Sequence, residues 1–242
     1  MSLRATNLSK TYYNKRVVRD ITIEVNKGEV VALLGPNGAG KTTCFSMIAG
    51  LVKIDSGFLY IDDTEITNLP IYKRAKYGIG YLPQESSIFR GMNVEDNIYA
   101  ILEFVEKDQE IAKKRLEELL GDFSISHLKY VDSNNLSGGE RRRVEIARAF
   151  AMNPQFILLD EPLAGIDPIA IDEIKNLIKS LKEKKLGILI TDHNVRETLG
   201  IIDRGYVIYN GQIIFSGSPK EIIKSDLVKQ VYLGENFYIP AE

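Results

Sequence analysis

The most constraining feature of this sequence is an apolar run that ends in a glycine-rich loop. Residues 30–34 (Val-Val-Ala-Leu-Leu) are continuously apolar, as in a strand that is covered on both faces of a sheet. The next eight residues, Gly35 to Thr42, match G-x-x-x-x-G-K-[ST] without a mismatch, and a helical pattern follows from Lys41 to Gly50. Because glycines let backbone N–H groups and a helix N-terminus face an anion, this segment predicts a phosphate site.

Each part of the loop has an expected role. The Lys41 ammonium would reach the β- and γ-phosphates of a nucleotide, and the Thr42 hydroxyl would ligate Mg²⁺. A phosphate loop alone indicates only a nucleotide, since GTPases, kinases, helicases and transport ATPases share it. The residues expected to bind the nucleotide in this loop are Gly35, Pro36, Asn37, Gly38, Ala39, Gly40, Lys41, Thr42 and Thr43.

A second apolar strand ends in two carboxylates, in the sequence Leu158-Leu159-Asp160-Glu161-Pro162. Side chains at the carboxyl end of a central parallel strand point into the ligand crevice. Asp160 is therefore expected to hold Mg²⁺, and Glu161 to polarise the attacking water as a general base. The alternative is an acidic strand end that caps the next helix.

The wider pattern predicts an α/β fold. Apolar runs at 156–159 and 187–191 flank a predicted helix over Asp172–Lys185, and such strand–helix–strand repetition is typical of a parallel sheet. Residues 88–153 have a helical pattern and are expected to form an insertion. After it, a hairpin is expected around Asn210-Gly211, followed by a helix that Ser218 caps.

Composition excludes several function classes. Lys and Arg number 31 against 33 Asp and Glu, so the net charge of −2 argues against a nucleic-acid binder. The single cysteine, Cys44, cannot form an intrachain disulfide and fits a reducing compartment. No run approaches the roughly 18 apolar residues of a membrane span, and the first residues have no signal-peptide pattern. We therefore expect a cytoplasmic protein.

A second anion-binding device lies about twenty residues before the acidic strand end. In Leu136-Ser137-Gly138-Gly139-Glu140, the serine would cap a helix and the two glycines would expose backbone N–H groups. If two chains each contributed one device to each nucleotide, ATP would hold a head-to-tail pair together. The following run, Arg141–Arg143, could contact nucleic acid or form a solvated or ion-paired helix start.

In this order, these motifs resemble those of the ABC transporter ATPases, and the resemblance covers essentially the whole chain. It implies a single domain, 1–242, in which 1–87 and 154–242 form the P-loop NTPase core with a mainly parallel sheet and an N-terminal antiparallel β subdomain. Residues 88–153 would form a helical subdomain. It also implies ATP and Mg²⁺ as cofactors and ATP hydrolysis as the activity.

The resemblance assigns further site residues. Gln84 would touch Mg²⁺ and the attacking water, and His193 would contact the γ-phosphate and act with Glu161 in catalysis. Tyr12, or its rival Tyr13, would stack on adenine. Ser137, Gly138, Gly139 and Glu140 would bind the partner chain's ATP, with Asp167 in a loop at the interface. In that loop Ala164 replaces the more usual serine, which puts a hydroxyl contact there in doubt.

Several segments, among them Gly78–Glu85 and Thr191–Thr198, are most similar to the ATPases of lipopolysaccharide export in Gram-negative bacteria. The resemblance implies a homodimer on the cytoplasmic face of the inner membrane. Two transmembrane permease subunits would dock near Phe89 and Arg90, and membrane contact would come only through them. The ATPases of branched-chain amino acid import are the nearest alternative. Soluble ABC ATPases that act on DNA or ribosomes are a more distant one.

Overall fold

Alternating apolar side chains build the N-terminal sheet. The computed structural model describes residues 1–234 and 237. Residues 21–25 alternate apolar and polar, which is typical of a half-buried strand, and Ile21, Ile23 and Val25 are buried whereas the residues between them are not. The sheet is antiparallel, with the order β2-β1-β4-β5. Its strands are β1 Ser2–Tyr12, β2 Lys15–Asn26, β4 Ser56–Ile61 and β5 Thr64–Glu65.

The second sheet has the order β10-β9-β3-β8-β7-β6 and is parallel except for the pair β9–β10. Every residue of β3, β7 and β8 is buried, as expected for strands covered on both faces. The predicted mainly parallel sheet is confirmed. Its strands are β3 Val30–Leu34, β6 Ile79–Leu82, β7 Phe156–Asp160, β8 Gly187–Thr191, β9 Arg204–Tyr209 and β10 Gln212–Gly217.

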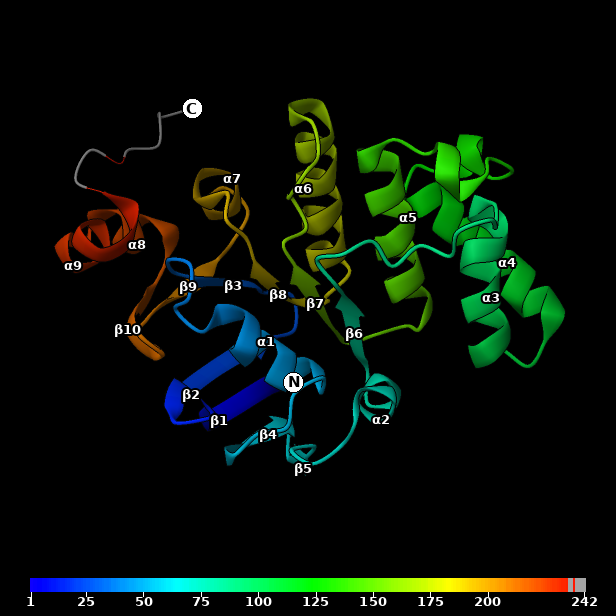
Figure 1. Ribbon diagram of the computed structural model, residues 1–242. Helices are drawn as coiled ribbons and strands as arrows, with labels where there is room; N and C mark the ends of the chain where they lie inside the picture. The colour runs from blue at the N-terminus through cyan, green and yellow to red at the C-terminus, as the bar shows by residue number, and fades with distance from the viewer. Residues whose placement is uncertain (235–236, 238–242) are drawn as a thin grey trace.

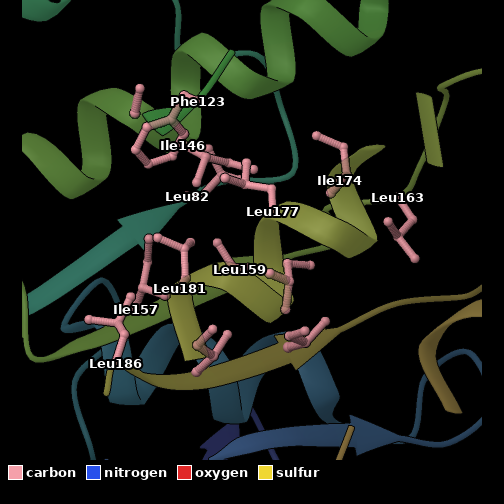
Figure 2. Close-up of a cluster of buried hydrophobic side chains, with 14 of the residues drawn as sticks. Leu82, Phe123, Ile146, Ile157, Leu159, Leu163, Ile174, Leu177, Leu181 and Leu186 are labelled. Atoms are coloured by element: carbon pink, nitrogen blue, oxygen red, sulfur yellow. The ribbon is translucent and has the colours of Figure 1, made fainter. Parts of the chain in front are cut away.

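Helices cover both faces of this sheet (Figure 1). Helix α1 packs between the two sheets, where Phe45 and Met47 are fully buried. Helix α6 covers the opposite face, and Figure 2 shows its Leu177 and Leu181 with Ile157 and Leu159 of β7. The core helices are α1 Lys41–Ala49, α2 Ile71–Lys76, α6 Pro168–Glu183, α7 Val195–Leu199, α8 Pro219–Lys224 and α9 Asp226–Val228, before a π-helical turn, Lys229–Leu233.

The predicted helical insertion forms a separate group of helices beside the sheet (Figure 1). It contains α3 Val94–Val105, α4 Gln109–Asp122 and α5 Gly138–Ala151, with short 3₁₀ turns at Ser126–Leu128 and Ser133–Asn135. Helix α3 contacts both α4 and α5, and α5 also packs on α6. The exact boundaries at 87/88 and 153/154 stay predictions.

Local signals near the C-terminus are confirmed. Asn210 and Gly211 both have positive φ, 48° and 81°, as the turn of a tight hairpin requires. Ser218 and Glu221 form a capping box at the start of α8. The last residues, 238–242, in which the sequence has no recognisable motif, lie outside the described residues, as do residues 235–236.

One helix starts earlier than its apolar pattern indicates. The pattern predicts residues 172–185, but α6 begins at Pro168 because the Asp167 carboxylate accepts hydrogen bonds from the N–H groups of Ile169 and Ala170. Proline at the first helical position adds to this start signal. Among the described residues, no helix combines the length and apolar character that a membrane span needs.

Substitution of Gly187, at the start of β8, tests the packing of the parallel sheet. A Cβ atom there would lie 2.4 Å from the buried Phe156 ring and 2.9 Å from the Asn26 carbonyl oxygen. We expect Gly187→Ala to lower the free energy of unfolding by about 1–3 kcal/mol, measured by urea titration.

The control is Gly121→Ala in α4, where a Cβ would meet nothing within 4 Å. Gly121 lies in the last turn of α4, so that change should alter the free energy of unfolding by less than about 0.5 kcal/mol. Equal effects of the two substitutions would show that the close approach at Gly187 is not a packing constraint.

Candidate nucleotide-binding and hydrolysis site

Strand register brings the predicted site residues to one edge of the parallel sheet. In the ladders, Thr191 of β8 pairs with Leu33 of β3 on one side and with Asp160 of β7 on the other. The phosphate loop begins two residues after Leu33. Glu161 follows Asp160 directly, and His193 lies two residues beyond Thr191. The carboxyl ends of three adjacent strands therefore carry the three motifs, as in other open α/β sheets.

The phosphate loop wraps the start of α1. The Lys41 ammonium lies 2.7 Å from the Gly35 carbonyl oxygen and 3.1 Å from that of Pro36. Burial lowers the pKa of Lys41, while Glu161 and Asp160 act in the opposite direction. Gly40 has φ 106°, and a Cβ there would lie 2.6 Å from the Val17 carbonyl oxygen, so only glycine fits.

An open pocket of about 510 Å³ lies over this loop. Its size suits a nucleotide-sized ligand. Seven of the nine loop residues predicted to bind nucleotide line the pocket, together with Gln84, Glu161 and His193. The complete lining is Lys15, Val17, Asn37, Gly38, Ala39, Gly40, Lys41, Thr42, Thr43, Gln84, Glu161 and His193.

Three polar side chains meet at the pocket floor. The Glu161 carboxylate has one oxygen 2.6 Å from His193 Nε2, and the other accepts a hydrogen bond of 2.8 Å from Gln84 Nε2. Burial raises the pKa of Glu161, while His193 opposes the rise. A carboxylate with a raised pKa that faces a pocket is suited to accept a proton from water.

The backbone at Glu161 is strained, which fixes where its side chain points. Its φ is 48°, in the left-handed region that a residue other than glycine seldom adopts. The Glu161 N–H donates a hydrogen bond of 2.8 Å to the Thr191 carbonyl oxygen, and the Glu161 carbonyl accepts one from Ala164 N–H. The turn is thus held against β8.

Asp160 is buried and does not line the pocket, although the adjoining Glu161 does. One of its oxygens accepts a hydrogen bond of 2.5 Å from the Thr191 hydroxyl, and burial raises its pKa. Among the described residues, no group of three or more His, Cys, Asp or Glu side chains could by itself hold a metal ion. A carboxylate, the Thr42 hydroxyl and the Gln84 amide oxygen fit Mg²⁺, which keeps waters and phosphates as ligands.

The predicted helix cap in Leu136–Glu140, called the signature segment from here on, is confirmed. The Ser137 hydroxyl accepts from Glu140 N–H, and the Glu140 carboxylate accepts from Ser137 N–H, which completes a capping box at the start of α5. Ser137 and Gly138 are exposed, and Gly139 is packed so closely that a Cβ there would lie 2.5 Å from the Ala170 Cβ. Ser137 to Glu140 do not line the pocket of the same chain.

Other predicted positions lie outside the pocket as well. Tyr12 ends β1 and is 40% exposed, so it is not packed in the core, but it does not line the pocket. Tyr13 is fully exposed in the adjoining turn. Asp167 caps α6 on the exposed loop beside the signature segment, since Gly138 would place a Cβ 3.6 Å from the Gly165 carbonyl oxygen.

Sequence reasoning missed Lys15 and Val17, which reach the pocket from β2. It also treated Arg141–Arg143 as one run, whereas the structure separates them. Arg142 is buried and pairs with Glu145. Its guanidinium donates to the carbonyl oxygens of Pro83, Asp160 and Glu161. The ion-paired alternative is correct for Arg142, though not as a solvated helix start.

The Arg142–Glu145 pair links the helical group to the hydrolysis site. Glu145 accepts hydrogen bonds from the Ser86 hydroxyl and from Ser87 N–H, so it holds the loop that carries Gln84. Both side chains stand on α5, the helix that begins at the signature segment. The pair therefore connects α5, the Gln84 loop and the turn at Glu161.

Substitution of Arg142 tests how much free energy of unfolding is lost when the buried Glu145 carboxylate has no ion-pair partner. We expect Arg142→Met to lower the free energy of unfolding by about 3–5 kcal/mol, because Glu145 loses its partner. Adding Glu145→Gln, which keeps an acceptor but no charge, should recover part of that loss. The control Arg141→Met should cost less than about 1 kcal/mol. Equal costs at 141 and 142 would contradict the pairing.

Comparison with known proteins places this arrangement in a family. The family model for the ABC transporter matches residues 18–164. A "Probable ABC transporter ATP-binding protein" of Azorhizobium caulinodans is 55% identical over 98% of this chain and 84% of its own length. The "Lipopolysaccharide export system ATP-binding protein LptB" of Escherichia coli K12 is 54% identical over 98% of both chains.

Solved structures agree in fold. The ADP conformation of MJ1267, an ATP-binding cassette of an ABC transporter, covers 97% of this chain and 100% of its own, with a TM-score of 0.85 at 34% identity. A dimeric structure of MJ0796, a bacterial ABC transporter cassette, covers 90% and 98%, with a TM-score of 0.79 at 26% identity. The chain belongs to the ABC transporter ATP-binding subunits, whose ATP hydrolysis is coupled to transport.

Proposed function

We propose that two copies of this chain close head to tail on two ATP molecules and so drive lipopolysaccharide export. A shared site is supported because the signature segment does not reach the pocket of its own chain. The pocket over the phosphate loop has no lining residue from the signature segment, yet Ser137 and Gly138 are exposed at a helix N-terminus that suits an anion. The MJ0796 cassette, a structural relative, has been solved as a dimer.

Within each site the residues divide the work. Lys41 and the phosphate-loop N–H groups bind phosphate oxygens, while Ser137 to Glu140 and Asp167 come from the partner subunit. Mg²⁺, held by Thr42, Gln84 and Asp160, would neutralise phosphate charge. Glu161 takes a proton from the attacking water, and His193 contacts the γ-phosphate and keeps Glu161 in line. Tyr12 is the proposed adenine contact, with Tyr13 as the alternative.

The Glu161→Gln variant separates binding from hydrolysis. The amide is close in shape to the carboxylate but cannot accept the proton, so turnover should fall about 10²-fold or more while ATP binding persists. Because ATP then stays intact at the interface, the variant should accumulate as a dimer in size-exclusion chromatography with ATP and Mg²⁺. A monomeric or fully active variant would contradict the proposed role.

The cargo is proposed from one observation, the 54% identity to E. coli LptB over 98% of both chains. Similarity that extends over the full length includes the surfaces by which a transport ATPase meets its membrane partners. In this proposal the protein lies on the cytoplasmic face of the inner membrane. It reaches the membrane only through two permease subunits.

The loop at Phe89 is built as an anchor for such a partner. Its backbone is fixed because Phe89 N–H donates to the buried Asn97 side chain, while the Phe89 carbonyl accepts from Asn97 and from the Ser133 hydroxyl. The ring remains 39% exposed, with the Arg148 guanidinium 3.7 Å from its centre. A pre-ordered aromatic beside exposed Arg90 suits an interface hot spot.

Depletion of the protein in its source bacterium tests both the cargo and the proposed docking site at Phe89. Lipopolysaccharide should accumulate at the inner membrane, and a Phe89→Ala copy should fail to restore export. The matched control is Phe104→Ala, which removes an 83% exposed ring at the far end of α3 and should restore export. Selective loss of leucine uptake on depletion would instead support the amino acid importer.

A further inference from the structure

Asp192 is a fully buried carboxylate that lies between the two residues proposed for hydrolysis, and it has no role in the mechanism given above. It follows β8 directly, between Thr191 and His193, and is 1% exposed. Burial raises its pKa, while backbone N–H groups act against the rise. A carboxylate in this environment is costly unless its oxygens are well hydrogen-bonded. The hydrogen-bond donors around Asp192 therefore indicate its role.

Each oxygen of Asp192 accepts a hydrogen bond from a backbone N–H, and the two donors belong to different segments of the chain. One oxygen accepts from Leu163 N–H at 3.0 Å, in the turn that begins at Glu161. The other accepts from Asn194 N–H at 2.8 Å, directly after His193. One side chain thus fixes the backbone two residues after Glu161 and one residue after His193.

The turn at Glu161 needs such a restraint. Its left-handed φ is costly, so the conformation persists only if surrounding contacts hold it. Thr191 fixes the turn at Glu161 N–H, and Arg142 fixes it at the Glu161 carbonyl. Asp192 supplies the next contact along the chain, at Leu163, and it is the contact that also reaches the His193 loop.

We propose that Asp192 is a positioning residue that sets the distance between Glu161 and His193, and that it acts on the hydrolytic step rather than on ATP binding. Lys41, Thr42 and the other phosphate-loop residues lie between the end of β3 and the first turn of α1, and no hydrogen bond of the described residues links them to Asp192. Loss of the carboxylate should therefore lower kcat and leave the KM for ATP nearly unchanged. This inference rests on the proposed roles of Glu161 and His193.

The test compares Asp192→Asn and Asp192→Ala with the parent dimer. The asparagine amide keeps one acceptor oxygen but places its NH₂ group against the backbone N–H of either Leu163 or Asn194. Alanine removes both acceptors. We expect kcat to fall about 10- to 100-fold in the Asp192→Asn variant and further in the Asp192→Ala variant. A small misplacement of Glu161 or His193 relative to the reacting atoms has effects of this size. KM for ATP should change less than about 3-fold. If the Asn variant does not fold, the Ala variant carries the same test.

The matched control is Asp203→Asn. Asp203 also accepts a backbone N–H, from Val30 at 2.9 Å, and an ion pair from Lys182, but it lies at the opposite end of β3. It should lose thermal stability with kcat unchanged. A purely structural Asp192 would behave like Asp203, and that result would overturn the inference. Normal ATP hydrolysis by Glu161→Gln would contradict the proposed function itself. An unchanged kcat in Asp192→Asn, with hydrolysis lost in Glu161→Gln, would contradict only the role of Asp192.

Discussion

The register of three parallel strands is the constraint on which the site depends. Thr191 pairs with Leu33 and with Asp160, so β3, β8 and β7 end at the same level. A one-residue slip of β7 would move the side chains of Asp160 and Glu161 each to the other face of the sheet. It would thereby separate Glu161 from His193. The continuous burial of these strands gives that register little freedom, because every side chain on either face has packing partners.

The helical group is tied to this edge by buried polar contacts rather than by apolar packing alone. Arg142 and Glu145 extend from α5 to the backbone of Asp160 and Glu161 and to the loop after Gln84. A buried ion pair adds little to stability when compared with apolar residues, but it is costly to break and is directional. It therefore suits a joint that transmits the position of one element to another. In the proposed transport cycle, the loop at Phe89 would carry that movement to the membrane subunits.

Much of the site could be predicted from the sequence because its parts are local. The phosphate loop needs glycines at fixed offsets, and Ser137 with Glu140 is a capping box that can be seen in five residues. Contacts between distant segments could not be predicted in the same way. Lys15 and Val17 reach the pocket only because β2 folds against the phosphate loop, and Arg142 cannot be told from Arg141 or Arg143 without the turn at Glu161.

Strand β1 and the start of helix α6 are difficult to predict from the sequence because neither follows a regular apolar pattern. The residues of strand β1 do not by themselves predict a strand, since many of them are polar and the register against β2 shifts three times, which disrupts the period-2 pattern. The apolar pattern predicts the start of α6 four residues late, because it does not include the helix cap at Asp167. The Asp167 carboxylate and Pro168 together start the helix before its apolar pattern begins.

Chemical cross-linking tests the central claim, that each nucleotide site is shared between two chains. Asn37 and Ser137 are exposed, and the native Cys44 is buried with its pKa raised to about 12, so it does not react. Chains carrying Asn37→Cys and chains carrying Ser137→Cys, each with Glu161→Gln, are mixed with ATP and a short thiol cross-linker. A site shared between two chains predicts a cross-linked pair only in the mixture and only with ATP. Equal cross-linking within either variant alone, or none in the mixture, would contradict it.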